Sequence, residues 1–327
     1  MNMPDPATDP SRAAPAVPAS PAEPAVPAVP AADAGAVGGP PYRTLVSVAQ
    51  LRSMLDSGTR CVLLDCSFDL TDAGKGERAW LAGHVPGAWY VHLDRDLSGP
   101  KEPAGPRSPR FTGRHPLPSR EALAALAGRL GIAPGVQVVC LDGDGSPYAA
   151  RAWWLLRWLG HEAVAVLDGG IAAWRAAGGV LTQEPVTGPE LPPYPAAATG
   201  ALPMIDAATL LAGLGTHRIL DARTGERYRG ETEPLDPVAG HIPGALNRFF
   251  KDNLQADGRF KPAGQLREEF AALGLESAQG VVQQCGSGVT ACHNLLAMAH
   301  AGLGVSALYP GSWSEWCADP ARPIARG

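Results

Sequence analysis

The sequence predicts an α/β protein with two tandem domains, each a mostly parallel sheet with helices on both faces. Three observations support this prediction. The chain has 327 residues, and two domains fit that length because domains usually contain about 100–200 residues. Apolar, β-branched runs alternate with segments of helical periodicity, which is typical of parallel α/β sheets. The same order of elements also occurs twice, and this indicates a duplicated fold.

Two proline-rich stretches divide the chain. Residues 1–41 are almost wholly Ala, Pro, Val and Asp. Such a composition buries too little apolar surface to offset the ordering of the backbone, so we expect a disordered tail. The second stretch, "QEPVTGPELPPYPAAATG" at 183–200, separates two patterned regions and is typical of an interdomain linker. We therefore predict domains at 42–182 and 201–327.

Each patterned region opens with the same local elements. A strand that ends in Asp comes first, in "CVLLDCS" and in "RILDART". A Gly-His-aliphatic-Pro-Gly-Ala turn follows, "GHVPGA" at 83–88 and "GHIPGA" at 240–245. The next segments, "SREALAALAGRLGI" and "AGQLREEFAALGL", repeat Leu and Ala at helical spacing before a Gly stop. We therefore predict the same strand, turn and helix in each half.

The remaining elements of the two halves also match. The runs "VQVVCL" and "GVVQQ" predict buried parallel strands, and a loop and another helix follow each. The closing segments "VAVLDGGIAAW" at 164–174 and "SALYPGSWSEW" at 306–316 predict a strand, a Gly turn and a helix that carries Trp. Trp153, Trp154 and Trp158 recur at helical spacing in an apolar segment, so we interpret them as core residues.

Charge and composition narrow the classes of partner. The formal net charge of −5 gives no electrostatic reason to expect binding to nucleic acid or to an anionic membrane. No apolar run approaches the ~20 residues that span a bilayer, and the N-terminus does not resemble a signal peptide. We expect a soluble, cytoplasmic protein.

Its six cysteines form no CxxC pair, and His293 has no ligand-spaced partner, so we expect reduced thiols and no metal site.

Cys285 is the candidate nucleophile. It lies in "VVQQCGSGVTACHNLL" at 281–296, where a buried strand ends and a Gly-broken loop leads to a helix expected over 289–301. The dipole of that helix favours a thiolate, and α/β sheets bind ligands at the carboxyl ends of their strands. Aligning the halves places Asp142 opposite Cys285. The halves therefore share a fold but not a nucleophile, and we predict a reactive cysteine rather than an inert buried one.

These features resemble the two-domain rhodanese-like sulfurtransferases. The resemblance rests on "CGSGVTA" at 285–291, on the paired "GHVPGA" and "GHIPGA" turns and on "GSWSEW" at 311–316. It covers about residues 42–320. It implies two tandem rhodanese-like domains, of which only the second carries a cysteine that holds a persulfide. The implied chemistry requires no metal and no organic cofactor.

The residues after the cysteine distinguish the donors within this family. Enzymes that prefer thiosulfate tend to have basic residues there, whereas 3-mercaptopyruvate enzymes tend to have Gly-Ser, as in Gly286 and Ser287 here. The resemblance therefore implies sulfur transfer from 3-mercaptopyruvate through a Cys285 persulfide. The implied acceptors are cyanide, a small thiol or thioredoxin. The loop residues expected to hold the persulfide are Gly286, Gly288, Val289 and Thr290.

The resemblance also implies a Ser-His-Asp relay. Its serine would be Ser287, and its histidine would come from the HxPGA turn of the first domain, which is His84. Asp72, upstream of His84, is our choice for the acid. His241 occupies the equivalent turn of the second half, so a purely structural role for His84 is the alternative.

Arginines would bind the carboxylate of the substrate. The family uses an arginine in a "GRF" or "GRY"-like stretch, which matches Arg227 in "ERY". Mercaptopyruvate enzymes often add an arginine in an "EPR" stretch, but this sequence has Leu235 in "EPL". Arg223 and Arg248 are the candidates to compensate, and a surface or ion-pairing role is the alternative for each.

Three other functions remain open. The absent arginine at Leu235 leaves thiosulfate sulfurtransferase as an alternative. A cysteine phosphatase has an arginine at the sixth position after its cysteine, but that position is Ala291 here, so a phosphate would lack its bidentate clamp. A noncatalytic rhodanese-like binding module is the third alternative, and the presence of Cys285 argues against it.

Overall fold

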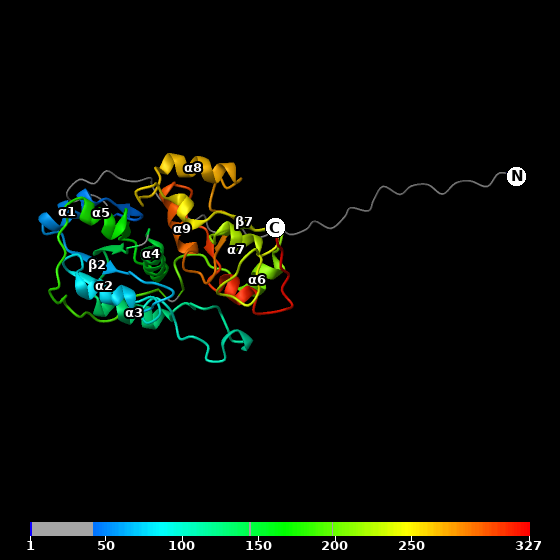
Figure 1. Ribbon diagram of the computed structural model, residues 1–327, viewed down its shortest axis with the longest axis horizontal. Coiled ribbons are helices and arrows are strands. Elements are labelled where there is room, and N and C mark those ends of the chain that lie inside the picture. The colour runs from blue at the N-terminus through cyan, green and yellow to red at the C-terminus, as the bar shows by residue number, and fades with distance from the viewer. Residues whose placement is uncertain (2–41, 144, 198) are drawn as a thin grey trace.

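The computed structural model describes residues 1, 42–143, 145–197 and 199–327 (Figure 1). Apart from Met1, the tail predicted to be disordered lies outside the described residues. The described chain contains two parallel sheets, one in each half, and helices cover both faces of each sheet. The predicted α/β class with two tandem units is confirmed. Among the described helices, none is both long and apolar enough to cross a membrane.

The first sheet has the strand order β1-β5-β4-β2-β3, and its pairings are parallel. Its strands are β1 (Leu45–Val46), β2 (Cys61–Asp65), β3 (Ala88–Tyr90), β4 (Gln137–Leu141) and β5 (Val164–Leu167). The helices of this half are α1 (Val48–Asp56), α2 (Lys75–Ala82), α3 (Arg120–Arg129), α4 (Pro147–Leu159), α5 (Gly170–Ala176) and a 3-10 helix at Gly105–Arg107. Ser47 and Ser119 begin α1 and α3 as N-caps, because each hydroxyl accepts a hydrogen bond from a first-turn amide.

The second sheet has the strand order β7-β6-β8-β9, again with parallel pairings. Its strands are β6 (Arg218–Asp221), β7 (Leu246–Asn247), β8 (Val281–Gln284) and β9 (Ala307–Leu308). The helices of this half are α6 (Ala207–Ala212), α7 (Gly225–Arg229), α8 (Ala263–Ala272), α9 (Ala291–His300), α10 (Ser312–Trp316) and a 3-10 helix at Phe250–Asn253. This strand order matches β3-β2-β4-β5 of the first sheet, so the two halves repeat one topology, as the sequence pattern predicts.

Alternation along the central strands explains why helices cover both faces. Leu64 and Cys140 belong to a core with α3 and α4, whereas Leu63 and Val139 belong to a separate core with α1 and α5. Successive side chains of a strand point to opposite faces of its sheet. Because both sets are apolar, both faces are buried, which is the pattern of a parallel sheet between two helix layers.

The segment proposed as a linker runs along α3. The amide of Leu191 donates to Gly128 O at 3.0 Å, and the amide of Tyr194 donates to Ala124 O at 2.9 Å. The described residues of this segment form no helix or strand. From the sequence pattern, we propose a first domain at 42–182, a linker at 183–200 and a second domain at 201–327.

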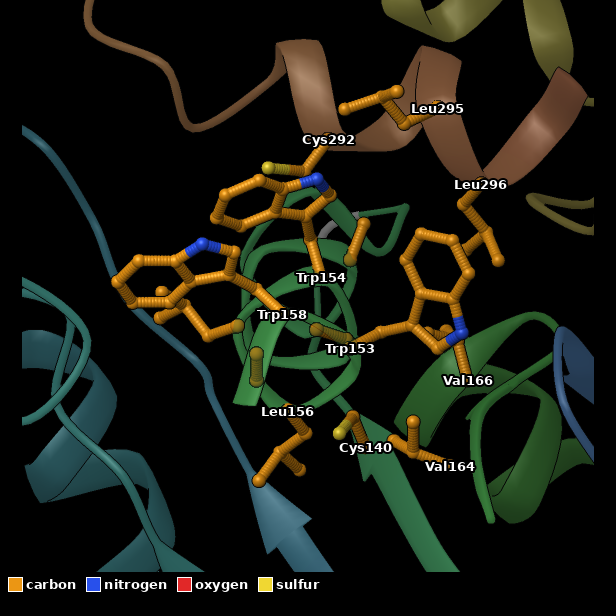
Figure 2. Close-up of a cluster of buried hydrophobic side chains, with 14 of the residues drawn as sticks. Cys140, Trp153, Trp154, Leu156, Trp158, Val164, Val166, Cys292, Leu295 and Leu296 are labelled. Carbon is orange, nitrogen blue, oxygen red and sulfur yellow. The ribbon is translucent and has the colours of Figure 1, made fainter. Parts of the chain in front are cut away.

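Helices α4 and α9 pack against each other between the two halves (Figure 1). Figure 2 shows Trp154 and Trp153 on α4 directed toward α9, where Cys292 and Leu296 lie. The rings of Trp154 and Trp158 stack with their centroids 5.8 Å apart. All three tryptophans are buried, so their predicted core role is confirmed. Since α4 and α9 each follow an inner strand of their own sheet, this contact brings the first half close to the loop between β8 and α9.

Candidate active site

Cys285 follows β8 directly and opens the loop that leads to α9. The helix begins at Ala291, slightly later than the predicted start near Val289. Gly288 has a φ of +77°, and a β-carbon at this position would lie 2.3 Å from Pro310 O. Only glycine fits there, because a side chain would face both an unfavourable φ and a backbone clash. The Gly-rich run after the cysteine therefore serves the tight turn that the sequence predicts.

The segment around α10 holds the cysteine loop in place. The amide of Cys285 donates to Ser312 Oγ at 3.1 Å. Cys285 O accepts from the amide of Trp313 at 3.0 Å, and Gly286 O accepts from the amide of Ser314 at 2.9 Å. Cys285 itself is only 2% exposed. Cys285 is therefore almost fully enclosed by protein atoms in this structure.

The loop carries backbone N–H groups that the protein does not use. Within the described part of the chain, the amides of residues 286–290 donate to no protein group. Val289 is buried, and Thr290 is the N-cap residue of α9, without a side-chain cap. Buried N–H groups need acceptors, and successive free amides before a helix form an anion-binding surface. The loop is therefore suited to hold a negative charge next to Cys285.

In the first half, a carboxylate fills the equivalent loop. Asp142 follows β4 as Cys285 follows β8. Its carboxylate accepts hydrogen bonds from the amides of Ser146, Tyr148 and Ala149, at 2.9, 3.0 and 3.0 Å. In the first half, an aspartate carboxylate bound to backbone amides thus occupies the position that Cys285 occupies in the second half.

A serine, a histidine and an aspartate form a row beside the loop. Ser287 Oγ lies 2.7 Å from His115 Nδ1, and His115 Nε2 lies 3.5 Å from Asp94 Oδ1. His115 and Asp94 belong to the segment between β3 and α3, which extends toward the second half (Figure 1). The amide of Arg114 anchors this segment by donating to Ser314 Oγ at 3.1 Å. The two halves therefore build the site together.

His115 is a neutral imidazole at ordinary pH. Burial lowers its pKa to about 3, although the nearby Asp94 carboxylate acts in the opposite direction. The cations Arg151 and Arg114 lower the pKa further. A neutral ring next to a hydroxyl can either accept its proton or donate to its oxygen, so His115 is able to set the protonation of Ser287.

Two arginine side chains lie over the residue that follows the cysteine. A β-carbon on Gly286 would lie 2.9 Å from Arg114 Nη2 and 3.4 Å from Arg227 Nη2. Arg227 Nη2 also binds Glu233 at 2.7 Å. Both guanidinium groups therefore border the loop on the side of Gly286, where a planar anion can meet them.

Comparisons with known proteins agree with this architecture. A family model described as a rhodanese-like domain matches residues 47–177 and 206–319. The chain is 47% identical over 289 residues to a "Probable 3-mercaptopyruvate sulfurtransferase" of Pseudomonas aeruginosa, which covers 86% of this chain and 98% of that protein. This chain belongs to the two-domain rhodanese-like sulfurtransferases.

Some other relatives of this sulfurtransferase are named for thiosulfate, and others are named for 3-mercaptopyruvate. A thiosulfate sulfurtransferase of Mus musculus is 34% identical over 303 residues, which is 88% of this chain and 96% of that protein. The structure of SseA from Escherichia coli, a 3-mercaptopyruvate sulfotransferase, aligns with a TM-score of 0.67 at 30% identity, over 84% of this chain and all (100%) of that one. The 3-mercaptopyruvate sulfurtransferase of Leishmania major aligns with a TM-score of 0.72 at 27% identity, over 84% of this chain and 74% of that one.

In this sulfurtransferase, His84 makes contacts that its counterpart in the other half repeats. Its Nδ1 lies 2.9 Å from Trp80 O, and its ring stacks on Trp80 with centroids 4.3 Å apart. His241 Nδ1 lies 2.8 Å from Tyr228 O, and that ring stacks on Tyr228 at 3.9 Å. The same arrangement in both halves indicates that these histidines build the turn.

The structure brings a different histidine and a different acid to Ser287 from those that the sequence suggested. Asp72 is a surface residue paired with Arg78, and among the described residues no hydrogen bond or ion pair joins it to His84 or Ser287. His115 and Asp94 lie in a stretch of the first half that is much longer than its counterpart in the second. The sequence did contain a signal for these two residues, namely a histidine and an acid in a segment that is longer in one repeat than in the other. Such a segment is a natural place to look for residues that only one repeat contributes to the site.

Three predicted arginines lie in different settings. Arg227 borders the loop, as described above. Arg223 is buried and bonds Asp221 and Glu233 at 2.6 and 3.3 Å, so its guanidinium is engaged within the protein. Arg248 is also buried, with Glu269 2.7 Å away. We therefore interpret Arg223 and Arg248 as structural.

A further arginine reaches the loop from the first half. Arg151 on α4 is fully buried and donates to Gly288 O at 3.1 Å and to His115 O at 3.3 Å. Burial lowers the pKa of Arg151, whereas the neighbouring Cys292 and Cys285 act in the opposite direction. Guanidinium starts so high that it stays charged. By contrast, burial raises the pKa of the Cys292 thiol to about 12, so Cys292 is a neutral packing residue.

Proposed function

We propose that this chain is a 3-mercaptopyruvate sulfurtransferase that carries the transferred sulfur as a Cys285 persulfide. The hydrogen bond between Ser287 Oγ and His115 Nδ1, 2.7 Å long, is the observation that supports this donor best. Loss of sulfur from 3-mercaptopyruvate leaves an enolate that must gain a proton, and a hydroxyl held by an imidazole is suited to deliver one. Thiosulfate instead releases sulfite, a stable anion that needs no proton.

The first half-reaction forms the persulfide. The Cys285 thiolate attacks the thiol sulfur of 3-mercaptopyruvate, so a new S–S bond forms and the C–S bond breaks. The electron pair of that bond remains on carbon as the enolate of pyruvate. The proton of the substrate thiol is transferred to this carbon through Ser287, with His115 holding the hydroxyl and the Asp94 carboxylate 3.5 Å from the far side of the ring. The products are pyruvate and an anionic persulfide on Cys285.

Backbone amides and one buried cation would stabilise this persulfide. The amides of Gly286, Gly288, Val289 and Thr290 donate to no protein group among the residues that the structure describes. Arg151 adds a positive charge from the first half, and it donates to Gly288 O of the same loop at 3.1 Å. In the equivalent loop of the first half, the Asp142 carboxylate accepts hydrogen bonds from amides of the loop and of the first turn of α4, which supports an anion-binding role for a loop of this kind.

Arg227 is the proposed partner of the substrate carboxylate. It lies over Gly286, next to the nucleophile, and it is half-buried rather than fully enclosed. A guanidinium group can bind a carboxylate through two parallel hydrogen bonds. The keto acid would then extend from Arg227 toward Cys285 and Ser287.

The second half-reaction returns Cys285 to the thiolate. A nucleophilic acceptor attacks the outer sulfur, and the S–S bond breaks with its electron pair on Cys285. Cyanide would leave as thiocyanate, and a small thiol or thioredoxin would leave as a persulfide. We propose these acceptors because the outer sulfur of a persulfide is electrophilic toward such anions. We also propose a cytoplasmic location.

Thiosulfate sulfurtransferase is the second candidate. The observation that favours it is Leu235, which is 44% exposed and stands where mercaptopyruvate enzymes often have an arginine. The test is kcat/KM of the purified full-length chain for both donors, with cyanide as acceptor. We expect the higher value for 3-mercaptopyruvate, whereas a higher value for thiosulfate would establish the second candidate.

Intact-mass measurement tests the third candidate, the noncatalytic module. After treatment with 3-mercaptopyruvate and no acceptor, we expect the wild-type chain to gain one sulfur atom. Cys285→Ser should gain none and should not turn over either donor. If wild-type protein stays unmodified by both donors, the chain is a binding module rather than an enzyme.

A further inference from the structure

Arg114 approaches the catalytic loop from the first half of the chain. Its Nη2 atom would lie 2.9 Å from a β-carbon on Gly286, closer than either terminal nitrogen of Arg227. Its side chain is 25% exposed, so it lies between the loop and solvent. We propose that Arg114 determines donor specificity by binding the substrate carboxylate together with Arg227. This inference rests on the proposed function and adds a second cation to it.

The two arginines are already spaced for one carboxylate. Asp236 pairs with Arg114 through Oδ1, and its Oδ2 lies 3.4 Å from Arg227 Nη2. One carboxyl group therefore bridges the two guanidinium groups in this structure. A substrate carboxylate that meets the same pair next to Gly286 can share these donors, because each guanidinium presents several N–H groups in a plane.

Arg114 also provides the charge that the second half lacks. Leu235 stands where a second arginine is expected, and its side chain cannot bind an anion. Glu233 and Asp236, on either side of it, direct their carboxylates to arginines at the loop. The cation that Asp236 meets through Oδ1 comes from Arg114 rather than from its own segment. Arg114 thus fills the role of the absent residue from the opposite half.

The backbone around Arg114 is held firmly enough for this role. The Arg114 amide donates to Ser314 Oγ at 3.1 Å. Gly113 has a φ of +102°, and a β-carbon there would lie 2.7 Å from Gly311 O, so the two segments meet backbone to backbone. The next residue, His115, bonds Ser287. One docked tripeptide therefore places both the carboxylate-binding cation and the imidazole of the relay.

Steady-state kinetics with 3-mercaptopyruvate and cyanide test this inference. For Arg114→Ala we expect KM for 3-mercaptopyruvate to rise about 10- to 100-fold, which corresponds to the loss of one charged hydrogen-bonding partner, with kcat changed much less. Arg114→Lys should recover part of the loss. Arg110→Ala is the matched control, because Arg110 lies in the same segment with an 84% exposed side chain, and its KM should equal the wild-type value.

Asp236→Asn separates substrate binding from a purely structural ion pair. If Arg114 binds substrate, removing the competing charge of Asp236 should leave KM unchanged or lower it. If the pair with Asp236 merely joins the two halves, Asp236→Asn should raise KM as Arg114→Ala does, and that result would overturn the inference. An unchanged KM in both Arg114 variants would also overturn it.

Turnover of the two donors by wild-type protein tests the proposed function separately from the role of Arg114. Wild-type protein that turns over thiosulfate but not 3-mercaptopyruvate would disprove the proposed donor, and with it the role of Arg114. Wild-type protein that uses 3-mercaptopyruvate normally, together with Arg114 variants that bind it equally well, would disprove the role of Arg114 alone. Equal thermal melting of the variants and wild type should accompany each comparison.

Discussion

Ser287 Oγ and His115 Nδ1 lie 2.7 Å apart, although 172 positions separate the two residues in the sequence. Ser287 belongs to the loop that follows Cys285 in the second half, and His115 belongs to a segment of the first half that docks on Ser314. The first half, which has Asp142 in place of Cys285, therefore supplies an imidazole to that loop.

His115→Asn should slow turnover of 3-mercaptopyruvate far more than turnover of thiosulfate. The variant removes the group that holds the proton of Ser287, and general acid–base catalysis contributes about 10²- to 10⁴-fold to a rate. We expect kcat for 3-mercaptopyruvate to fall within that range, measured as pyruvate released with cyanide as acceptor. The persulfide should still form from thiosulfate.

His84→Asn is the matched control for this variant. His84 stacks on Trp80 and bonds a backbone carbonyl, so its loss should lower the melting temperature and leave kcat nearly unchanged. If His84→Asn instead reduced kcat for 3-mercaptopyruvate selectively, while His115→Asn did not, the relay would belong to the residue that the sequence suggested.

The sequence predicted the repeated fold well because the signals for it are local. Strands β2, β6 and β8 lie within the apolar runs that predicted them, and α3 and α8 lie within the segments of helical periodicity. Cys285 was predicted as the nucleophile for the same reason, since a strand, a Gly-rich loop and a helix follow one another directly in the chain.

The partners of Cys285 and Ser287 were harder to predict because they come from the other half. The resemblance to the family pointed to the histidine of the HxPGA turn, His84, although its counterpart His241 already indicated a structural role. His115 lies in a segment that is much longer in the first half than in the second, and neither the motif nor the repeat marks it. Arg114 and Arg151 reach the loop only because α4 packs on α9 and the segment before α3 crosses the interface. Contacts of this kind depend on how two cores dock, and no local periodicity encodes them.

The activity of the enzyme should show no histidine titration near pH 6.5, which is the ordinary pKa of a histidine side chain. Burial lowers the pKa of His115 to about 3, so the ring stays neutral and competent as the pH falls through about 6.5, where a free imidazole would gain a proton. We expect kcat/KM for 3-mercaptopyruvate to show no inflection there. A loss of half the activity at about pH 6.5, absent with thiosulfate, would show that His115 titrates normally and is more exposed to water than the structure indicates.

Asp142→Ala should destabilise the protein without changing its chemistry. The variant leaves the amides of Ser146, Tyr148 and Ala149 without their carboxylate acceptor in a buried loop. An unsatisfied buried donor costs about 1–3 kcal/mol, so we expect the free energy of unfolding in urea to fall by at least that amount. The kcat for 3-mercaptopyruvate should remain near the wild-type value at temperatures where the variant is folded. A large loss of kcat with unchanged stability would mean that the first loop takes part in the reaction.

Arg151→Met should impair the reaction with both donors, because both pass through the same persulfide. The side chain of Met fills a similar volume but removes the donors to Gly288 O and His115 O and the positive charge that acts on Cys285. We expect kcat to fall by about 10- to 100-fold for 3-mercaptopyruvate and for thiosulfate alike, as for the loss of a charged hydrogen-bonding group.

Alkylation of Cys285 by iodoacetamide, followed by peptide mass mapping at a fixed pH, should also become slower, since a nearby cation favours the thiolate. Arg151→Lys, which keeps the charge, should react with iodoacetamide at nearly the wild-type rate. If Arg151→Met slowed turnover but left alkylation of Cys285 unchanged, Arg151 would act through the shape of the loop, and its charge would have no part in preparing the sulfur.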